Sequence, residues 1–143
     1  MSQSRKIVLC VDDNMEVLKS LRLQLRSGLK HRARIILAAG PDEALSALEV
    51  LQPKQSDAIL IVSDWLMPNM KGEELIRSIE SRWGELQTIV LSGHITEEAA
   101  LELSEMSQVL AIMAKPWSGE DLLQLVSRQL NISRLPQPIS SES

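Results

Sequence analysis

The sequence predicts an α/β fold, in which a doubly wound parallel sheet of five strands is covered by helices on both faces. Short apolar runs alternate with longer amphipathic segments five times along the chain. Each run is too short for a buried helix, and most are rich in Ile, Val and Leu, as strands buried on both faces are. Regular alternation of this kind indicates parallel strands joined by right-handed crossovers. The predicted strands span residues 7–11, 34–38, 58–62, 88–91 and 109–113.

The helices between these strands have recognisable ends. The first is predicted to run from about Asn14 to about Leu29, with Gly28 as its terminator. The second opens at Pro41, followed by acids that favour the positive end of the helix dipole, and stops before Pro53. The remaining three helices are predicted to begin after Gly72, at Thr96 and at Ser118.

The first predicted helix also shows which of its sides is buried. Val17, Leu18, Leu21 and Leu25 fall on one stripe and are predicted to face the core. Leu23 points to the opposite side, where a single exposed leucine is normal and a contact with a partner is the alternative.

Length and composition exclude several classes of protein. With 143 residues the chain has room for one core, and no apolar run approaches the roughly 20 residues of a membrane-spanning helix. Cys10 is the single cysteine and lies in an apolar run, so we expect a small core residue in a chain suited to the reducing cytoplasm. The net charge of −4 gives no support to nucleic-acid binding, and the basic stretch 30–34 is interpreted as a solvated turn.

Polar side chains follow four of the predicted strands. Asp12 and Asp13 end the first strand and Asp64 the third, while Ser92 ends the fourth and Lys115 the fifth. The carboxyl ends of the strands in a doubly wound sheet meet at one edge, where ligands bind. Three carboxylates, one hydroxyl and one ammonium group are therefore predicted to converge there.

A divalent cation explains this combination of charges. Three acids in one cleft repel one another, and Mg²⁺ removes the conflict because it prefers carboxylate, water and phosphate oxygens. One carboxylate can then attack phosphorus, while Lys115 supplies positive charge and Ser92 a hydrogen bond to the transition state. Taken singly, Asp13 could be a helix cap, Lys115 a surface residue and Ser92 part of a turn, so the prediction depends on the complete set.

Four motifs together resemble the response regulator receiver family. They are Val-Asp-Asp at 11–13, Asp-Trp-Leu-Met-Pro-Asn-Met-Lys-Gly at 64–72, Leu-Ser-Gly at 91–93 and Ala-Lys-Pro-Trp at 114–117, in family order and spacing. The likeness covers roughly residues 5–130, which we interpret as a receiver domain, with 131–143 as a flexible tail or the start of a linker. It implies a flavodoxin-like (βα)5 fold with strand order 2-1-3-4-5.

The resemblance assigns the metal site. Asp13 looks like the direct Mg²⁺ ligand and Asp12 like the acid that acts mainly through water. Asp64 and the backbone carbonyl of Leu66 are similar in position to the remaining ligands.

The resemblance also assigns the phosphorylation site. Asp64 is similar in position to the phosphoacceptor, Ser92 to the switch hydroxyl and Lys115 to the phosphate-binding lysine. The peptide bond between Lys115 and Pro116 is cis in the family, and we expect it to be cis here.

Partners and mode of action follow from the same likeness. Receivers are signalling domains rather than turnover enzymes; they accept phosphate from a histidine kinase or a histidine phosphotransfer domain, or from acetyl phosphate, and then change conformation to regulate an output. We expect a monomer or weak homodimer without direct nucleic-acid or membrane contact, either alone or followed by an effector domain absent from this chain. By resemblance, the donor protein would dock at Met15, Leu18, Pro116 and Trp117.

Two positions qualify the resemblance. Ile112 stands where family members usually carry Tyr or Phe as the aromatic half of the activation switch, and the chain contains neither residue. We therefore expect phosphorylation to survive but the signal to be weaker or differently routed. His94 either tunes the lifetime of the phosphoryl group or is an exposed loop histidine.

Three other functions compete with this one. A haloacid-dehalogenase-type phosphatase with an aspartyl nucleophile needs a second aspartate two residues later, where this chain has Leu66. A nucleotide-binding domain needs a glycine-rich loop after a strand, and the first predicted strand is followed by Asp-Asp-Asn-Met instead. A receiver that signals by protein contacts without phosphorylation would have no need of the complete acidic set.

Overall fold

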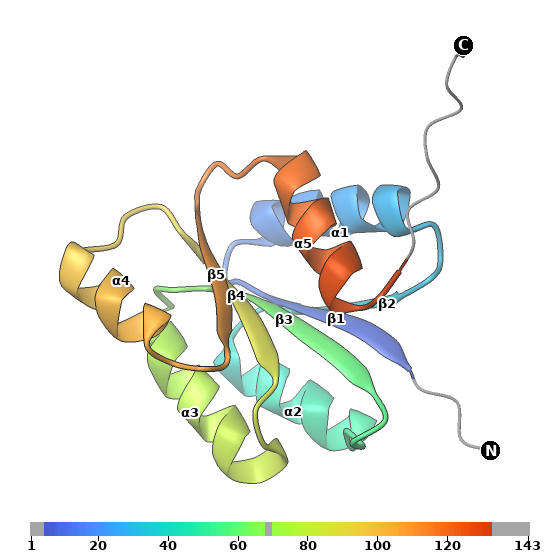
Figure 1. The fold of residues 1–143 in the computed structure, drawn as a ribbon, viewed down its shortest axis with the longest axis horizontal. Coiled ribbons are helices and arrows are strands. Elements are labelled where there is room, and N and C mark those ends of the chain that lie inside the picture. Colours follow the sequence, from blue (N-terminus) through green and yellow to red (C-terminus); the bar gives the residue numbers. More distant parts are fainter. Residues whose placement is uncertain (1–4, 68–69, 133–143) are drawn as a thin grey trace.

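The computed structural model describes residues 5–67 and 70–132, in which each of five strands is followed by one helix (Figure 1). The strands are β1 (Lys6–Val11), β2 (Arg34–Ala38), β3 (Ala58–Asp64), β4 (Gln87–Ser92) and β5 (Val109–Ala114). The helices are α1 (Met15–Leu29), α2 (Pro41–Leu51), α3 (Gly72–Trp83), α4 (Glu97–Ser104) and α5 (Gly119–Gln129). The predicted alternation is confirmed, and the predicted strands lie within the observed ones.

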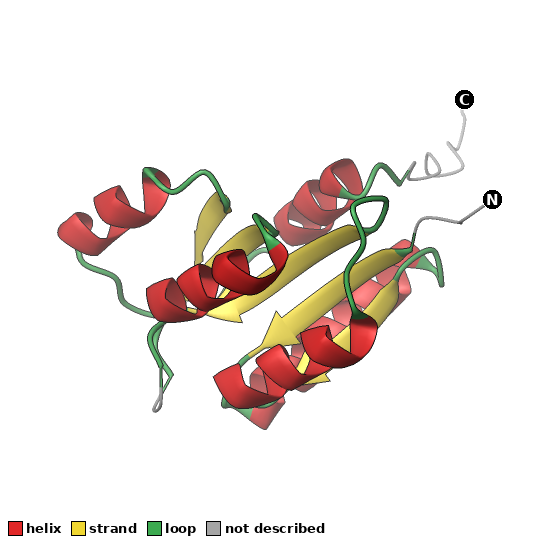
Figure 2. Ribbon diagram, turned by 90° about the horizontal axis from the view of Figure 1, so that it is seen from below, coloured by secondary structure: helices red, strands yellow, loops and turns green. Residues whose placement is uncertain are grey.

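The five strands form one parallel sheet in the order β2-β1-β3-β4-β5, so the predicted fold class and strand order are confirmed. Figure 2 shows the sheet as a layer between two layers of helices. Helices α1 and α5 cover one face, while α2, α3 and α4 cover the other. Because every strand runs the same way, all the carboxyl ends lie at one edge of the sheet.

Alternate residues of the central strands supply the two cores. On β1, Val8 and Cys10 pack with α1 and α5, whereas Leu9 and Val11 pack with α2 and α3. This is the period-2 pattern of a strand buried on both faces. Cys10 is fully buried, and burial raises the pKa of its thiol to about 12, so the cysteine is a neutral core residue as predicted.

Helix α1 keeps its predicted bounds but ends for a different reason. The Asn14 side chain caps it by accepting from the backbone N–H of Glu16. The prediction that Gly28 terminates the helix is wrong, because Gly28 lies inside it and Lys30, with φ 49°, is the C-cap. A Cβ at Gly28 would lie 2.3 Å from the side chain of Leu123, so this glycine lets α5 pack closely against α1.

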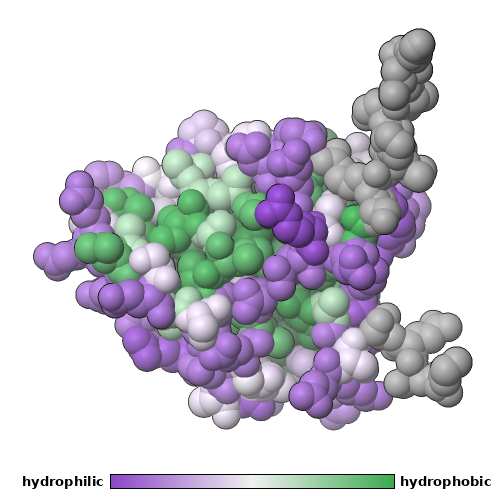
Figure 3. Space-filling view, in the orientation of Figure 1, coloured by the Kyte–Doolittle hydropathy of each residue, from purple (hydrophilic) through white to green (hydrophobic). Residues whose placement is uncertain are grey.

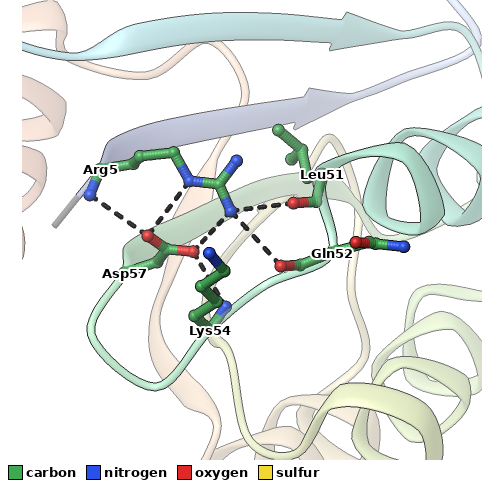
Figure 4. A network of polar contacts seen from close by, with 5 residues as sticks. All are labelled: Arg5, Leu51, Gln52, Lys54 and Asp57. Carbon is green, nitrogen blue, oxygen red and sulfur yellow. Dashed lines mark hydrogen bonds and ion pairs between the residues drawn. The ribbon is translucent and has the colours of Figure 1, made fainter. Parts of the chain in front are cut away.

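The amino end of the sheet is closed by an ion pair that the sequence analysis did not identify (Figure 4). The Arg5 guanidinium donates to both carboxylate oxygens of Asp57, at 2.6 and 3.2 Å, and to the carbonyl of Leu51 at the end of α2. The Asp57 side chain is 2% exposed and also accepts from the backbone N–H groups of Arg5 and Lys54. Hydrogen bonding to Arg5 holds the pKa of Asp57 well below its usual range.

The end of the described chain packs onto the core. Ile132 is buried in the same cluster as α1 and α5, and its N–H donates to the carbonyl of Ser127. Of the tail or linker predicted for residues 131–143, residues 133–143 lie outside the described residues. Within residues 5–67 and 70–132, no helix is both long and apolar enough to cross a membrane.

Candidate metal centre

Three aspartates converge at the carboxyl edge of the two central strands. Asp12 and Asp13 follow β1, and Asp64 is the last residue of β3, beside β1 in the sheet. One carboxylate oxygen from each of the three lies within 4.8 Å of the others. The structure thus brings together the acidic set that the strand ends predict.

Asp12 is the best anchored of the three. Its side chain is fully buried, one carboxylate oxygen accepts from the backbone N–H of Asn14 at 2.8 Å, and the other accepts from Lys115 Nζ at 2.9 Å. The Asp12 backbone N–H donates to the carbonyl of Ala38 on the edge strand β2. The sequence predicted Asn14 only as the start of a helix. Its backbone N–H, which holds the carboxylate of Asp12, is a part of the site that the sequence did not reveal.

Lys115 connects β5 to the acids. Its Nζ lies 3.3 Å from a carboxylate oxygen of Asp64, in addition to the contact with Asp12. Its backbone N–H donates to the carbonyl of Ser92, and its bond to Pro116 is cis, as expected. Burial by itself lowers the pKa of the Lys115 ammonium, but the hydrogen bond to Asp12 and the charges of Asp64 and Asp12 outweigh it, so the pKa is raised. Lys115 is therefore a fixed positive charge.

Asp64 is the acid of this set whose ionised form is disfavoured by its surroundings. Its side chain is 11% exposed, and burial together with the negative charge of Asp12 raises its pKa despite the opposing effects of Lys115 and the Leu66 backbone. The set holds three carboxylates, and the ammonium group of Lys115 contacts two of them, so the site keeps an excess of negative charge. An all-oxygen, acid-rich donor set of this kind fits a hard divalent cation. The predicted role of the Leu66 carbonyl as a ligand stays a prediction.

Ser92, His94 and Ile112 occupy distinct positions around this set. Ser92 is buried at the end of β4, and its hydroxyl oxygen accepts from the backbone N–H of His94 at 3.2 Å. The His94 side chain is exposed. Ile112 on β5 is half-buried against the cluster formed by Trp65, Val90 and Leu103 together with Ile76. Trp65, the residue after Asp64, therefore lies in the same apolar cluster as the usual switch position.

The residues predicted to dock a donor protein are not equally accessible. Met15 is 50% exposed and Pro116 is exposed, so both are available at the carboxyl edge. Leu18 is 1% exposed and belongs to the core beneath α1, so the expectation that it contacts a partner is wrong. Trp117 is half-buried, and its indole N–H donates to the side chain of Gln24 at 2.7 Å, which ties the loop after β5 to α1.

Fold and site together define a class: a doubly wound α/β domain with a candidate centre of three carboxylates at the carboxyl edge of its sheet. Residues 8–127 match the response regulator receiver domain. The chain belongs to the response regulator receiver family, a family of signalling domains from two-component systems.

Individual relatives agree with this assignment. The chain is 28% identical to the hydrogenase transcriptional regulatory protein HoxA of Cupriavidus necator, covering 94% of this chain and 26% of HoxA. It is 30% identical to the C4-dicarboxylate transport transcriptional regulatory protein DctD of Pseudomonas aeruginosa, covering 90% of this chain and 26% of DctD. The chain thus spans about a quarter of the length of these relatives. The crystal structure of a response regulator receiver protein from Pseudomonas putida is 30% identical, with a TM-score of 0.73, covering 89% of this chain and 99% of that one.

Proposed function

We propose that this domain accepts a phosphoryl group onto Asp64 in a Mg²⁺-dependent reaction and then changes conformation to regulate an output. The observation that supports this proposal most is the arrangement of charges around Asp64. Two further carboxylates lie within reach of it, and one ammonium group contacts both Asp64 and Asp12. This arrangement suits a nucleophilic carboxylate next to a bound cation and a bound phosphate better than it suits a purely structural role.

The chemistry uses Asp64 as nucleophile. A carboxylate oxygen of Asp64 forms a bond to phosphorus, while the bond from phosphorus to the donor breaks and its electron pair leaves with the donor. The donor is the phosphohistidine of a kinase or phosphotransfer domain, or acetyl phosphate, whose leaving group is acetate. The transferred group carries negative charge on its equatorial oxygens, and Lys115 is placed to offset that charge. The Ser92 hydroxyl can donate to a phosphoryl oxygen, because it accepts rather than donates in its contact with His94.

The three aspartates have different proposed roles in binding the Mg²⁺ ion. Both carboxylate oxygens of Asp12 already accept hydrogen bonds, whereas Asp13 is exposed beside it. We therefore assign Asp13 and Asp64 as direct ligands, with the carbonyl of Leu66, and Asp12 as an acid that acts through water and orients Lys115. Bound Mg²⁺ supplies positive charge that neutralises the oxygens of donor and acceptor during transfer.

The switch signal would be carried by apolar packing rather than by rotation of a ring at position 112. Ile112 packs in one cluster with Trp65 and with Leu103 of α4. Movement of Ser92 toward a phosphoryl group would move the start of the β4–α4 loop, and this cluster connects that loop to β5. We expect a smaller displacement at Ile112 than an aromatic residue there would show.

The names and lengths of two relatives suggest what kind of output the domain regulates. Both HoxA and DctD are named as transcriptional regulators and are about four times as long as the matched segment. On that basis we propose that the receiver regulates an effector domain or a separate effector protein.

Intact-mass measurement after incubation with acetyl phosphate and Mg²⁺ tests the proposal. The parent protein should gain the mass of one phosphoryl group, and chelation of Mg²⁺ with EDTA should prevent the gain. Asp64→Asn should gain none, whereas Asp42→Asn, a matched change at an exposed acid in the first turn of α2, should behave as the parent does. Equal phosphoryl gain by Asp64→Asn, or none by the parent, would show that Asp64 is not the acceptor.

A further inference from the structure

Two segments at opposite edges of the sheet each carry charges of one sign. Residues 17–41 contain six Lys or Arg and no Asp or Glu, whereas residues 83–114 contain five Glu and no Lys or Arg. The first segment forms most of α1 and the edge strand β2, and the second contains α4 and the opposite edge strand β5. In Figure 1 helix α4 lies at the left end of the molecule, and α1 lies toward its upper right. The domain therefore has a cationic edge and an anionic edge.

The cationic edge is hollowed. A groove of about 630 Å³ follows the exposed side of α1 and shares three of its residues with a second hollow of about 380 Å³, which lies against the apolar side chains Ala33, Ile35 and Leu37 of the β2 region. No acid lines either hollow. The residues of the first groove are Lys19, Arg22, Leu23, Arg26, Ser27 and His31.

The cations of this groove are not neutralised within the described part of the chain. No ion pair there involves Lys19, Arg22 or Arg26. Arg22 and Arg26 stand four residues apart on α1, a spacing at which like charges disfavour the helix. Cations placed in this way gain stability when an acidic surface covers them.

A leucine lies among these cations and is largely exposed. Leu23 is 73% exposed, with Lys19 four residues before it and Arg26 three residues after it on the same helix. These spacings put all three side chains on neighbouring positions of the helix surface. A lone exposed leucine is ordinary, but one within a cationic groove combines an apolar contact with charge selectivity.

Helix α4 presents the opposite pattern. Leu101 is 65% exposed, with Glu97 and Glu98 four and three residues before it and Glu105 four residues after it. Hydrophilic residues border an apolar area at this end of the molecule in Figure 3. An exposed leucine between acids on one helix thus matches an exposed leucine between cations on another.

We propose that the α1–β2 groove of one copy of this domain binds helix α4 of a second copy. Leu101 of one copy would pack against Leu23 of the other, and the glutamates of α4 would lie over Lys19, Arg22 and Arg26. The two surfaces are different, so the contact is heterologous, and each copy can engage a neighbour at both edges. A contact of two helices is smaller than a standard stable interface, so the association is weak and sensitive to salt.

A second copy is the proposed occupant because it accounts for both the cationic groove around Leu23 and the acidic surface around Leu101. A polyanion such as a nucleic acid would cover the cations but would leave Leu101 and the glutamates of α4 without a role. An unrelated acidic protein would fit the groove equally well but would also leave α4 unexplained. This inference does not depend on the phosphorylation of Asp64.

Sedimentation velocity of the unphosphorylated protein over a range of concentrations tests the proposal. The parent should self-associate at about 10 mM salt and become monomeric near 1 M, as the Debye length falls from about 30 Å to about 3 Å. Arg22→Glu/Arg26→Glu and Glu98→Lys/Glu105→Lys should each weaken self-association by at least about tenfold. An equimolar mixture of the two variants should associate again, because the unchanged groove of one fits the unchanged α4 of the other. The matched control, Arg77→Glu/Arg128→Glu on α3 and α5, should associate almost as the parent does.

Each alternative result overturns the proposal. A parent protein that stays monomeric at low salt would exclude a second copy and leave an acidic partner protein as the occupant. Self-association that survives both double variants would place the interface elsewhere. If circular dichroism shows both variants folded and the mixture still fails to associate, the groove does not bind α4.

Discussion

The two ends of the sheet both place an aspartate next to a basic side chain, and the consequences are opposite. At the amino end, one carboxylate, that of Asp57, receives hydrogen bonds from the Arg5 guanidinium and from two backbone N–H groups (Figure 4). At the carboxyl end, three carboxylates lie together, and the ammonium group of Lys115 contacts two of them, those of Asp12 and Asp64. The pKa of Asp57 is lowered, whereas burial and the charge of Asp12 raise the pKa of Asp64.

This difference shows how one residue type serves two purposes. Asp57 is held as an ion by its surroundings and ties Arg5, the residue before β1, to the loop between α2 and β3. Asp64 is disfavoured as an ion in the absence of a metal, so its site gains stability when a cation binds. The shifted pKa of Asp64 and its position in an acidic cluster support a functional role, whereas the hydrogen bonds of Asp57 support a structural one.

Loss of Lys115 should have the largest effect. Lys115→Met removes the ammonium group that contacts Asp12 and Asp64, and phosphoryl gain from acetyl phosphate should slow by about 100-fold or more. Arg77→Met, at an exposed cation of α3, is the control and should leave the rate unchanged. The rate is followed by intact mass over time. A Lys115→Met rate within a few-fold of the parent would mean that Lys115 does not act on the transferred group.

Asp57→Asn should destabilise the fold. The change removes the ionic partner of Arg5 and weakens the hydrogen bonds that close the amino end of the sheet, so the melting temperature should fall by about 5 °C at neutral pH. Phosphoryl gain by the folded variant should be unchanged, because Asp57 lies at the other end of the strands. Differential scanning calorimetry measures the first effect, and an unchanged melting temperature would refute a structural role for this pair.

The stability difference between the parent and Asp57→Asn should depend on pH in a defined direction. Because the pKa of Asp57 is lower in the folded state, its contribution is fully present above its unfolded pKa of about 4 and is lost as pH falls toward the folded pKa. Urea unfolding at neutral pH and near pH 3 should therefore show a smaller difference at the lower pH. A difference that grows on acidification would contradict the lowered pKa.

Asp64→Asn should have the opposite effect on stability. With Mg²⁺ removed by EDTA, the variant loses the repulsion between Asp64 and Asp12 and the cost of burying a charge, so its melting temperature should rise by about 2 °C. The parent protein in the same buffer is the reference. A fall comparable to that of Asp57→Asn would show that the contact with Lys115 outweighs the repulsion.

His94→Ala should have the smallest effect. The His94 side chain is exposed, and its backbone N–H, which the substitution keeps, makes the contact with Ser92. The rate of loss of the phosphoryl group, followed by intact mass after Mg²⁺-dependent loading, should change by less than about twofold. A larger change would assign this histidine to tuning the phosphate lifetime.

The features predictable from the sequence are those encoded by neighbouring residues. Strand and helix positions follow from local periodicity and from caps such as Asn14, Thr96 and Ser118, all of which cap helices in the structure. The acids at the strand ends could be grouped because parallel strands end at one edge of the sheet.

The features that were missed depend on distant parts of the chain. The role of Gly28 is decided by Leu123 on another helix, and the partner of Arg5 lies in the loop before β3. For Leu18 the sequence supports two incompatible predictions, a core position from the helical stripe and a docking position from the resemblance. Leu18 is buried, so the core prediction is confirmed.

The most direct test of the account measures the thermal stabilisation that Mg²⁺ gives to three proteins. The parent should show a rise in melting temperature on addition of Mg²⁺, and Asp57→Asn should show the same rise from a lower starting point. Asp13→Asn should show little or none, because it lacks the exposed ligand of the acidic set. An equal rise in Asp13→Asn and the parent would contradict the claim that the carboxyl edge of the sheet holds the metal.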